Sequence, residues 1–380
     1  MPLSVSLPVQ SLEVQESAGL ESASYPGEEY SAGMATSRNR TKRKKKALGA
    51  AGTFLALVFV ALVGVGAVAW LVFVPFGPLT ETFVQIAPGS STTRIAQQLE
   101  SAGIVRSQFA FDLVRWVKRG KLKAGEYRFD HPVPLTEIYD RIARGDVYTV
   151  AVTVPEGASI FDIATRLEQA GIGTRQDFLD EQARQTGLVA DLDPQAKSLE
   201  GYLFPDTYRF PRKATPAQIA AAMVRRFRQM VEQLGLKENV HEVVTIASLV
   251  ERETAVDAER PLVASVFENR LAKHMPLMTD PSVIYGRELE HQWRGTIYES
   301  DLKRDTPYNT YLHAGLPPGP IANPGIPALR AAMQPANSKF LYFVAAGADP
   351  QGHSHFSETL EEHAQAVAGY RHAMKKAGGR

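Results

Sequence analysis

The stretch Thr245-Ile-Ala-Ser-Leu-Val-Glu-Arg-Glu-Thr254 places two acids at the end of an apolar run. Ala247 and Glu251 fall on one face of a helix by the i, i+4 spacing. Glu253 lies about 200° around the helix from Glu251, on the side of Leu249. The pattern predicts a mostly buried helix, and periodicity alone does not choose which acid faces the interior.

An acid on an apolar stripe has chemical consequences. Burying a carboxylate is unfavourable unless the group is paired or protonated. Desolvation raises the pKa of the carboxyl, and a raised pKa lets a glutamate hold and donate a proton at neutral pH. The alternative is a surface helix whose polar face carries both Glu251 and Glu253.

Composition excludes several classes of function. The chain has 380 residues, a net charge of +1 and 44% hydrophobic residues, which is enough for two or three small domains. The balanced charge gives no support to a nucleic-acid partner. The chain has no cysteine, so thiol catalysis, disulfides and cysteine-based zinc sites are excluded. Such a chain is compatible with life outside the cytoplasm.

The N-terminal region predicts a single membrane anchor. Residues 1–46 form a polar tail, expected to be disordered to about residue 40, that ends in the basic block Lys42-Arg-Lys-Lys-Lys46. The apolar run 47–76 is long enough to cross a bilayer. The basic block places the N-terminus in the cytoplasm and the chain after about Pro78 on the outer side. A signal peptide is the alternative, but the run is longer and lacks a small-residue cleavage site.

An internal repeat follows the anchor. The segment from Val84 to Ile104 matches the segment from Val152 to Ile172, each with a glycine turn and a glycine stop. Each copy predicts a short strand, a turn and a helix, capped by Ser90 or Ser91 in the first copy and by Ser159 in the second.

Residues 80–190 are therefore expected to form small α+β modules. A strand at 125–129 and a helix at 135–142 lie between the two copies. The strand–helix–Gly-Ile unit resembles LysM-type glycan-binding modules. The alternative is a spacer that lifts the following domain off the membrane.

A second region, 191–375, differs from the first in amino-acid composition. It begins with an aromatic stretch, 200–208, and predicts helices at 215–235, 261–271 and 327–333. A buried strand is expected at 341–345 and a C-terminal helix from Ser357. Segments 275–286, 307–311 and 315–325 are rich in Pro, Gly, Asn and Tyr and predict turns and loops that carry functional side chains. The fold class is therefore α+β.

Residues 80–370 resemble the YceG-like endolytic murein transglycosylases, with the motifs in the family's order and spacing. The matching motifs are Glu200-Gly-Tyr-Leu-Phe-Pro-Asp-Thr-Tyr208, Ala247-Ser-Leu-Val-Glu-Arg-Glu-Thr254, Val266-Phe-Glu-Asn-Arg-Leu271, Met275-Pro-Leu277, Asp280-Pro-Ser-Val-Ile-Tyr-Gly286, Pro307-Tyr-Asn-Thr-Tyr311, Gly315-Leu-Pro-Pro-Gly-Pro-Ile321 and Asn323-Pro-Gly325.

The resemblance implies cleavage of the MurNAc–GlcNAc β-1,4 bond within peptidoglycan strands, with the MurNAc 6-hydroxyl rather than water attacking C1. It implies one acid/base residue, at Glu251, no metal and no cofactor. Glu253 is expected to orient neighbouring groups. The resemblance also suggests that the enzyme terminates strand elongation beside peptidoglycan synthases in the membrane. The residues expected to bind sugar in a groove are Asp280, Ser282, Tyr308, Asn309 and Asn323.

Three other readings remain open. A two-carboxylate muramidase would pair Glu251 with Glu253, Glu200 or Asp280 and release reducing ends. A non-enzymatic scaffold would rest on the LysM-like repeat alone. A metal site would use the histidine-rich segment before and within the C-terminal helix, although a polar loop that leads into a helix explains that segment more simply. The residues of that segment are His353, His355, Glu362 and His363.

Overall fold

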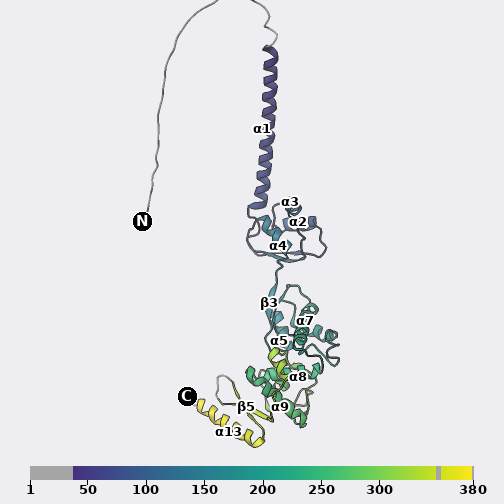
Figure 1. The fold of residues 1–380 in the computed structure, drawn as a ribbon, viewed down its shortest axis with the longest axis vertical. Helices are drawn as coiled ribbons and strands as arrows, with labels where there is room; N and C mark the ends of the chain where they lie inside the picture. Colours follow the sequence, from purple (N-terminus) through teal and green to yellow (C-terminus); the bar gives the residue numbers. More distant parts are fainter. Residues whose placement is uncertain (1–36, 348–351, 379–380) are drawn as a thin grey trace, which may run out of the picture. The chain divides into compact units, whose positions relative to one another are not determined.

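The computed structural model describes residues 37–347 and 352–378. The chain divides into two units, Met1–Trp70 and Leu71–Arg380 (Figure 1). Disorder was predicted to about residue 40: residues 1–36 of that stretch lie outside the described residues, whereas residues 37–40 are helical, which corrects the prediction there. Within the described part the fold is mixed α+β, as predicted.

The N-terminal helix α1 spans Ser37–Phe73. It therefore begins ten residues before the predicted apolar run and takes in the basic block, because lysine and arginine favour helices. Within it, Ala51–Phe73 is long and apolar enough to cross a membrane. The helix ends two residues before Pro75, since a proline disfavours helical geometry in the residue that precedes it.

The first repeat copy forms a strand–helix–helix–strand module with its own core. β1 pairs antiparallel with β2, and Val84 stands opposite Tyr127. Tyr127 and Phe129 of β2 and Ile138 and Ile142 of α4 are buried in this core. The elements are β1 (Thr82–Ile86), α2 (Thr92–Ser101), α3 (Gln108–Lys118), β2 (Gly125–Phe129) and α4 (Leu135–Arg144).

The second copy repeats this order, which confirms the predicted repeat. The turn glycines Gly89 and Gly157 have φ angles of 77° and 75°, a left-handed geometry that favours glycine. Ser91 and Ser159 cap the helices that follow by accepting hydrogen bonds from backbone N–H groups. The elements are β3 (Val150–Thr153), α5 (Ile160–Gln169), α6 (Arg175–Arg184), η1 (Thr186–Leu188) and β4 (Thr207–Phe210), and β3 pairs antiparallel with β4.

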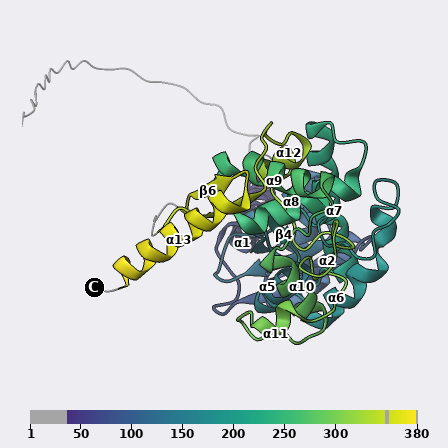
Figure 2. The same cartoon turned by 90° about the horizontal axis from the view of Figure 1, so that it is seen from below.

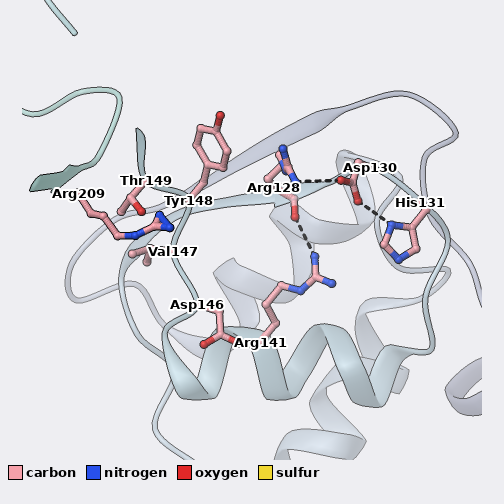
Figure 3. Close-up of a pocket in the computed structure, with 9 residues that line it drawn as sticks. All are labelled: Arg128, Asp130, His131, Arg141, Asp146, Val147, Tyr148, Thr149 and Arg209. Atoms are coloured by element: carbon pink, nitrogen blue, oxygen red, sulfur yellow. Dashed lines mark hydrogen bonds and ion pairs between the residues drawn. The ribbon is translucent and has the colours of Figure 1, made fainter. Parts of the chain in front are cut away.

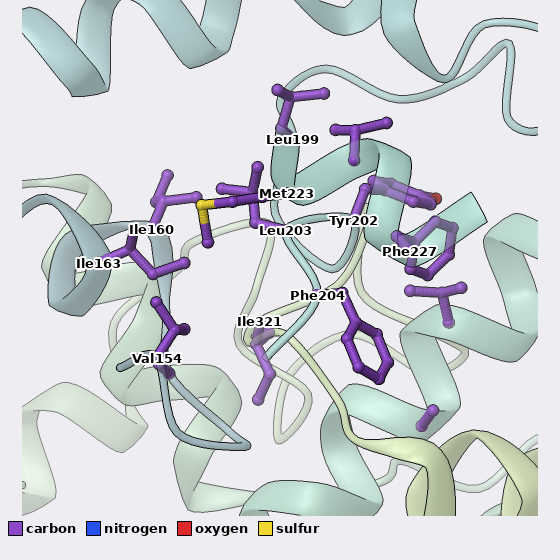
Figure 4. Packing of buried hydrophobic residues seen from close by; sticks show 14 of the residues in the cluster. Val154, Ile160, Ile163, Leu199, Tyr202, Leu203, Phe204, Met223, Phe227 and Ile321 are labelled. Atoms are coloured by element: carbon purple, nitrogen blue, oxygen red, sulfur yellow. The ribbon is translucent and has the colours of Figure 1, made fainter. Parts of the chain in front are cut away.

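The second copy shares one core with the helices that follow it. Val154 and Ile163 of the copy meet Met223 and Phe227 of the next long helix in this core (Figure 4). Among the described residues, the two cores therefore divide between Val147 and Val150. The helices are α7 (Pro216–Leu234), α8 (Val240–Glu253), η2 (Asp257–Glu259) and α9 (Arg260–Ala272).

The rest of the chain differs from the prediction in two places, one in a segment predicted as turns and one at the last strand and helix. A helix, α10, occupies part of the proline-rich segment: Thr279 caps it, and Pro281 fits its first turn because no backbone donor is needed there. The predicted buried strand is only half-buried and pairs with a strand missed in the sequence, which delays the last helix to Leu360 (Figure 2). The elements are α10 (Asp280–Leu289), α11 (Glu299–Leu302), α12 (Ile326–Met333), β5 (Tyr342–Ala345), β6 (Ser354–Ser357) and α13 (Leu360–Ala377).

Candidate functional site

Helix α8 runs through the second core, as its sequence predicted. The run from Val244 to Val250 is buried on every side, including the hydroxyls of Thr245 and Ser248. Thr245 donates to the carbonyl of His241 at 2.7 Å, and the Ser248 hydroxyl accepts from the N–H of Ile321 at 3.0 Å. A surface helix is excluded, and the two acids stand where α8 leaves the core.

Glu251 is part of a buried ion pair. Its side chain is 5% exposed, and its Oε1 lies 2.7 Å from Nη1 of Arg260, which is 6% exposed. Its Oε2 accepts a hydrogen bond from the N–H of Gly325 at 2.9 Å. Both carboxylate oxygens are thus engaged within the protein, and the group ties α8 to the start of α9 and of α12.

A second glutamate, Glu156, stands beside this pair. Burial, followed by the charge of Glu251, raises the pKa of the Glu156 carboxyl, whereas the charge of Arg260 opposes the rise. A side chain at Gly325 would meet Glu156 Oε1 at 1.8 Å, so the Glu156 side chain would have to move to make room for it. Glu156 belongs to the turn of the second repeat copy, and that turn is therefore packed directly against the end of α8.

Glu253 points to a different place. It lines a cavity of about 400 Å³ where the end of α8 meets α9, the loop before α10, β5 and α13. The other residues that line this cavity are Phe267, Arg270, Leu277, Met278, Asp280, Tyr311, Tyr342, Phe343, Leu360 and His363.

The cavity changes the acidity of Glu253. Burial of its carboxyl, followed by the negative charge of Asp280, raises the pKa of Glu253 to about 7. The charges of Arg270 and Arg252 and a hydrogen bond from Thr279 act in the opposite direction. At neutral pH this carboxyl can therefore give up or take up a proton, which is the property expected of an acid/base group.

Hydrogen bonds within the protein fix the polar side chains that lie beside Glu253. The Tyr311 hydroxyl donates to Asp280 at 2.6 Å. Arg270 donates to the carbonyls of Leu341 and Leu277 at 2.7 and 2.8 Å, which fixes its guanidinium at the cavity wall. Among these residues sequence reasoning singled out Asp280. Arg270 and Tyr311 lie in quoted motifs, but spacing gave no signal that they would meet Glu253.

Three predicted groove residues are buried and use their polar atoms inside the protein. Ser282, Asn309 and Asn323 are each 0% exposed. Ser282 donates to the Thr279 carbonyl at 2.8 Å. Asn309 donates to two backbone carbonyls and accepts from a backbone N–H. These residues shape the loops and do not line the Glu253 cavity.

Asn323 and Glu200 form a buried polar bridge to the second repeat copy. Asn323 donates to Glu200 Oε1 at 2.8 Å and to the Ala158 carbonyl at 2.9 Å. The N–H of Ile160 donates to Glu200 Oε2 at 2.9 Å. Burial raises the pKa of Glu200 to about 8 in spite of these donors. Tyr308, another predicted groove residue, packs edge-on against Tyr285 beside this bridge.

A smaller cavity of about 210 Å³ lies on the other side of the α8 terminus. Arg252 and Glu288 supply charged groups, and Trp293 supplies an aromatic ring. Burial, followed by the charge of Asp162, raises the pKa of Glu288 to about 7. The sequence did not single out Glu288 or Trp293. Arg252 and Glu253 are consecutive, so the end of α8 separates the two cavities.

A third hollow, of about 390 Å³, lies far from these acids in the chain, between β2, α4 and β4. Part of its charge is paired within it, because Asp130 pairs with Arg128 at 3.2 Å and with His131 at 2.6 Å (Figure 3). Arg141 donates to the carbonyl of Arg128 at 2.9 Å. We assign no chemistry to this hollow.

The histidine-rich segment contributes to the main cavity through His363, whose ring stacks on Tyr342 with centroids 5.1 Å apart. Within residues 37–347 and 352–378, no group of three or more His, Asp or Glu side chains is arranged to hold a metal ion.

Taken together, the α+β architecture and a titratable carboxyl at a cavity define a protein with a candidate acid/base site. The family model of the YceG-like family matches residues 84–369. This is more than half of the chain, and the chain belongs to the YceG-like family.

Two relatives that share the name endolytic murein transglycosylase agree with this assignment. A protein of Bacillus subtilis strain 168 named endolytic murein transglycosylase is 35% identical over 312 residues, which is 77% of this chain and 85% of that protein. A protein of the same name from Streptococcus pneumoniae strain D39 is 29% identical over 75% of this chain, but this alignment covers 57% of its length. A crystal structure of a YceG-like protein from Listeria monocytogenes shares 31% identity, with a TM-score of 0.49 over 76% of this chain and 99% of that one.

Proposed function

We propose that this chain is a membrane-anchored endolytic lytic transglycosylase that cleaves MurNAc–GlcNAc β-1,4 bonds within peptidoglycan strands. The single observation that carries the proposal is the Glu253 carboxyl, with a pKa of about 7, at a cavity of about 400 Å³ whose lining mixes charged and apolar side chains. The names of the relatives support the substrate and the reaction. The acid/base chemistry is argued from this chain's own residues.

Geometry favours an exchange of the roles expected from the sequence. Glu251 is 5% exposed, and each of its oxygens already has a partner inside the protein, Arg260 for one and the N–H of Gly325 for the other. Glu253 lines the cavity and sits at a pKa suited to proton transfer. We therefore assign the acid/base role to Glu253 and a structural role to Glu251.

The proposed reaction is an intramolecular transfer. Protonated Glu253 gives its proton to the glycosidic oxygen as the bond from this oxygen to MurNAc C1 breaks. The substrate's acetamide assists at C1. The MurNAc 6-hydroxyl then bonds to C1, and its proton returns to Glu253. No water is consumed, and a 1,6-anhydro end forms on the new terminus.

Asp280 and Tyr311 are the proposed substrate-contacting or supporting groups beside the acid. Their hydrogen bond of 2.6 Å keeps the Asp280 carboxylate close to Glu253, where its charge helps to hold the proton on the acid. The buried groups of Ser282, Asn309 and Asn323 are proposed to act by fixing the loops that carry these residues.

The same pair of carboxyls favours one second candidate. Glu253 and Asp280 line one cavity, as the acid and the second carboxylate of a muramidase would. Such an enzyme would activate water and release reducing ends. The products of the reaction therefore distinguish the two candidates.

The anchor and the repeats complete the proposal. We propose that Ala51–Phe73 crosses the membrane, with the basic block on the cytoplasmic side and the cavity on the outer side. The enzyme would then act on strands made beside it by peptidoglycan synthases. The two strand–helix–helix–strand copies are proposed as LysM-like glycan-binding modules, with a spacer role as the alternative.

Mass spectrometry of products from peptidoglycan tests the acid/base assignment. We expect Glu253→Gln to lower the yield of anhydro-MurNAc ends by about 10²–10⁴-fold, the usual contribution of an acid/base group. The control is the exposed carboxyl Glu299, whose change to Gln leaves the yield unchanged. Reducing ends from the native chain would favour the muramidase.

Glu251 needs a different variant, because its loss alone leaves the Arg260 charge buried and threatens folding. The double variant E251Q/R260M removes both charges and keeps an amide oxygen to accept from Gly325. We expect this variant, once folded, to retain anhydro products. Their loss in a folded double variant, together with an active E253Q chain, would return the role to Glu251.

A further inference from the structure

Helix α3 carries an apolar face that the rest of the protein does not cover. Phe109 is 76% exposed, Leu113 40%, Trp116 69% and Val117 66%. Their spacing places them on one stripe about 100° wide. The opposite side of the helix is buried in the first core. We call the stripe formed by Phe109, Leu113, Trp116 and Val117 the α3 face.

The second repeat copy shows that the fold does not require this face. Gly103 and Gly171 are 68 residues apart, and the same offset relates α3 to α6. The buried positions correspond at this offset: Ala110, Phe111 and Val114 of α3 match Phe178, Leu179 and Gln182 of α6.

The exposed positions differ in kind between the copies. Where the α3 face has its apolar side chains, α6 has polar or charged ones: Asp177, Glu181, Arg184 and Gln185. The same local fold is therefore compatible with an apolar surface on α3 and with a polar one on α6. Large exposed apolar patches mark interaction sites, so the apolar version has a partner.

Charge around the α3 face points to the kind of partner. The segment 106–123 contains six basic residues and one acid, Asp112, whereas the matching segment 174–191 contains two basic residues and four acids. An apolar stripe with aromatic side chains and a basic surround is the pattern of a helix that lies in the interface of an anionic bilayer.

The module that carries the α3 face follows directly after the proposed membrane segment in the chain. Leu71 and Val72, in the last turn of α1, pack in the first core. Exposed apolar side chains continue beyond them, with Phe73 at 64% and Leu79 at 87% exposure. The module therefore begins where the proposed membrane segment ends.

We propose that the α3 face inserts into the interfacial layer of the membrane that α1 crosses, with anionic lipid headgroups around its basic rim. This proposal rests on the membrane-spanning role of α1 and not on the enzymatic one. The module is then held at two places, by α1 and by α3, so that it cannot turn freely on its tether. Trp116 lies at the headgroup level, where tryptophan is enriched in membrane proteins.

The tryptophans of the chain allow a direct test in vesicles of phosphatidylglycerol and phosphatidylcholine. The full chain contains three: Trp70, Trp116 and Trp293. A chain that keeps Trp116 alone (W70F/W293F) is expected to show blue-shifted emission and quenching by lipids brominated near the headgroup. The chain that keeps Trp293 alone is expected to show no quenching. Quenching of the chain that keeps Trp70 alone verifies that α1 has inserted.

A labelling experiment gives an independent readout, because the natural chain has no cysteine. Val117→Cys is expected to lose its reaction with a water-soluble maleimide when the full chain is in these vesicles. Giving the same chain the residues of the second copy, F109D, L113E and W116R, is expected to restore labelling. Arg184→Cys, on α6, is labelled in both backgrounds.

The outcomes separate the bilayer from other partners. If Trp116 is unquenched and Val117→Cys is labelled while Trp70 is quenched, the α3 face does not meet lipid and the proposal is overturned. A protein partner would then be the occupant. Equal protection in vesicles of phosphatidylcholine alone would overturn the role assigned to the basic rim.

Discussion

The two repeat copies share one local fold but have different surroundings. In the first copy, the turn glycine Gly89 has no atom within 4 Å of the position where a side chain would begin. In the second, Gly157 packs against Glu251 and Arg252, accepts from the Arg252 side chain at 3.1 Å and donates to the Asn323 carbonyl at 2.9 Å. The same local sequence pattern thus forms a module with its own core in one place and a wall of the candidate site in the other.

The comparison teaches that a repeat acquires its role through its surface. The first copy has its own core and leaves the α3 face uncovered, whereas the second shares a core with α7 and α8. The second copy also carries polar residues on α6. The bridge between Asn323 and Glu200 lies beside it. Four predictions test this difference, from the largest expected effect to the smallest.

The ion pair that joins α8 to α9 beside the second copy is expected to matter most. Arg260→Gln leaves the Glu251 carboxylate buried without its partner, and we expect the free energy of unfolding to fall by about 3–5 kcal/mol. Arg144→Gln breaks the exposed pair with Asp146 near the first copy and should cost about 0–1 kcal/mol. Urea unfolding measures both. Similar losses would mean that the buried pair does not anchor the second copy.

The polar bridge comes next. Asn323→Ala removes the donor to Glu200 and the acceptor for the N–H of Leu203, so we expect a loss of about 1–3 kcal/mol. The control is Thr82→Ala in β1, which removes one exposed hydrogen bond and should change stability by about 0.5 kcal/mol or less. A negligible loss at Asn323 would show that the second copy is held by its apolar core alone.

The turn glycines give a matched pair. Gly89→Ala and Gly157→Ala each place a side chain at positive φ, and we expect each to cost about 1–2 kcal/mol in unfolding free energy. Only the change at Gly157 should also lower the yield of anhydro ends, because the strain falls on a turn whose backbone hydrogen-bonds to the Arg252 side chain and to Asn323. Equal activity in the two variants would remove the link between this turn and the site.

The smallest expected effect is a shift in the pH dependence of activity. It follows from a substitution in the cavity that leaves both repeat copies unchanged. The first step requires protonated Glu253, so kcat/KM should fall as pH rises through the Glu253 pKa, which is about 7. Asp280→Asn removes a negative charge that raises this pKa, and the fall should therefore move to lower pH. A profile that stays in place, or moves to higher pH, contradicts the electrostatic coupling of the two carboxyls.

For much of the site, the sequence predicted which segments contribute but not which of their side chains would meet. The apolar run before Glu251 predicted the buried helix, and the glycine and serine spacing predicted both copies of the repeat. Ser282, Asn309 and Asn323 were chosen because they stand in turn-rich motifs, and each proved to be buried with internal partners. Polar residues in such motifs serve the loop as often as a ligand, and the sequence does not distinguish the two cases.

The sequence by itself determined that an apolar helical stretch would lead up to Glu251, that the strand–helix unit would occur twice, and that the run 47–76 would hold an apolar helix long enough for a membrane. These features follow from local periodicity and capping. Tertiary structure alone decided which acid faces the cavity, because both sides of α8 are covered and the choice depends on Arg260 and Gly325 meeting Glu251. It also decided that Tyr311 and Asp280 would meet beside Glu253, since such contacts join residues far apart in the chain, and no local pattern encodes them.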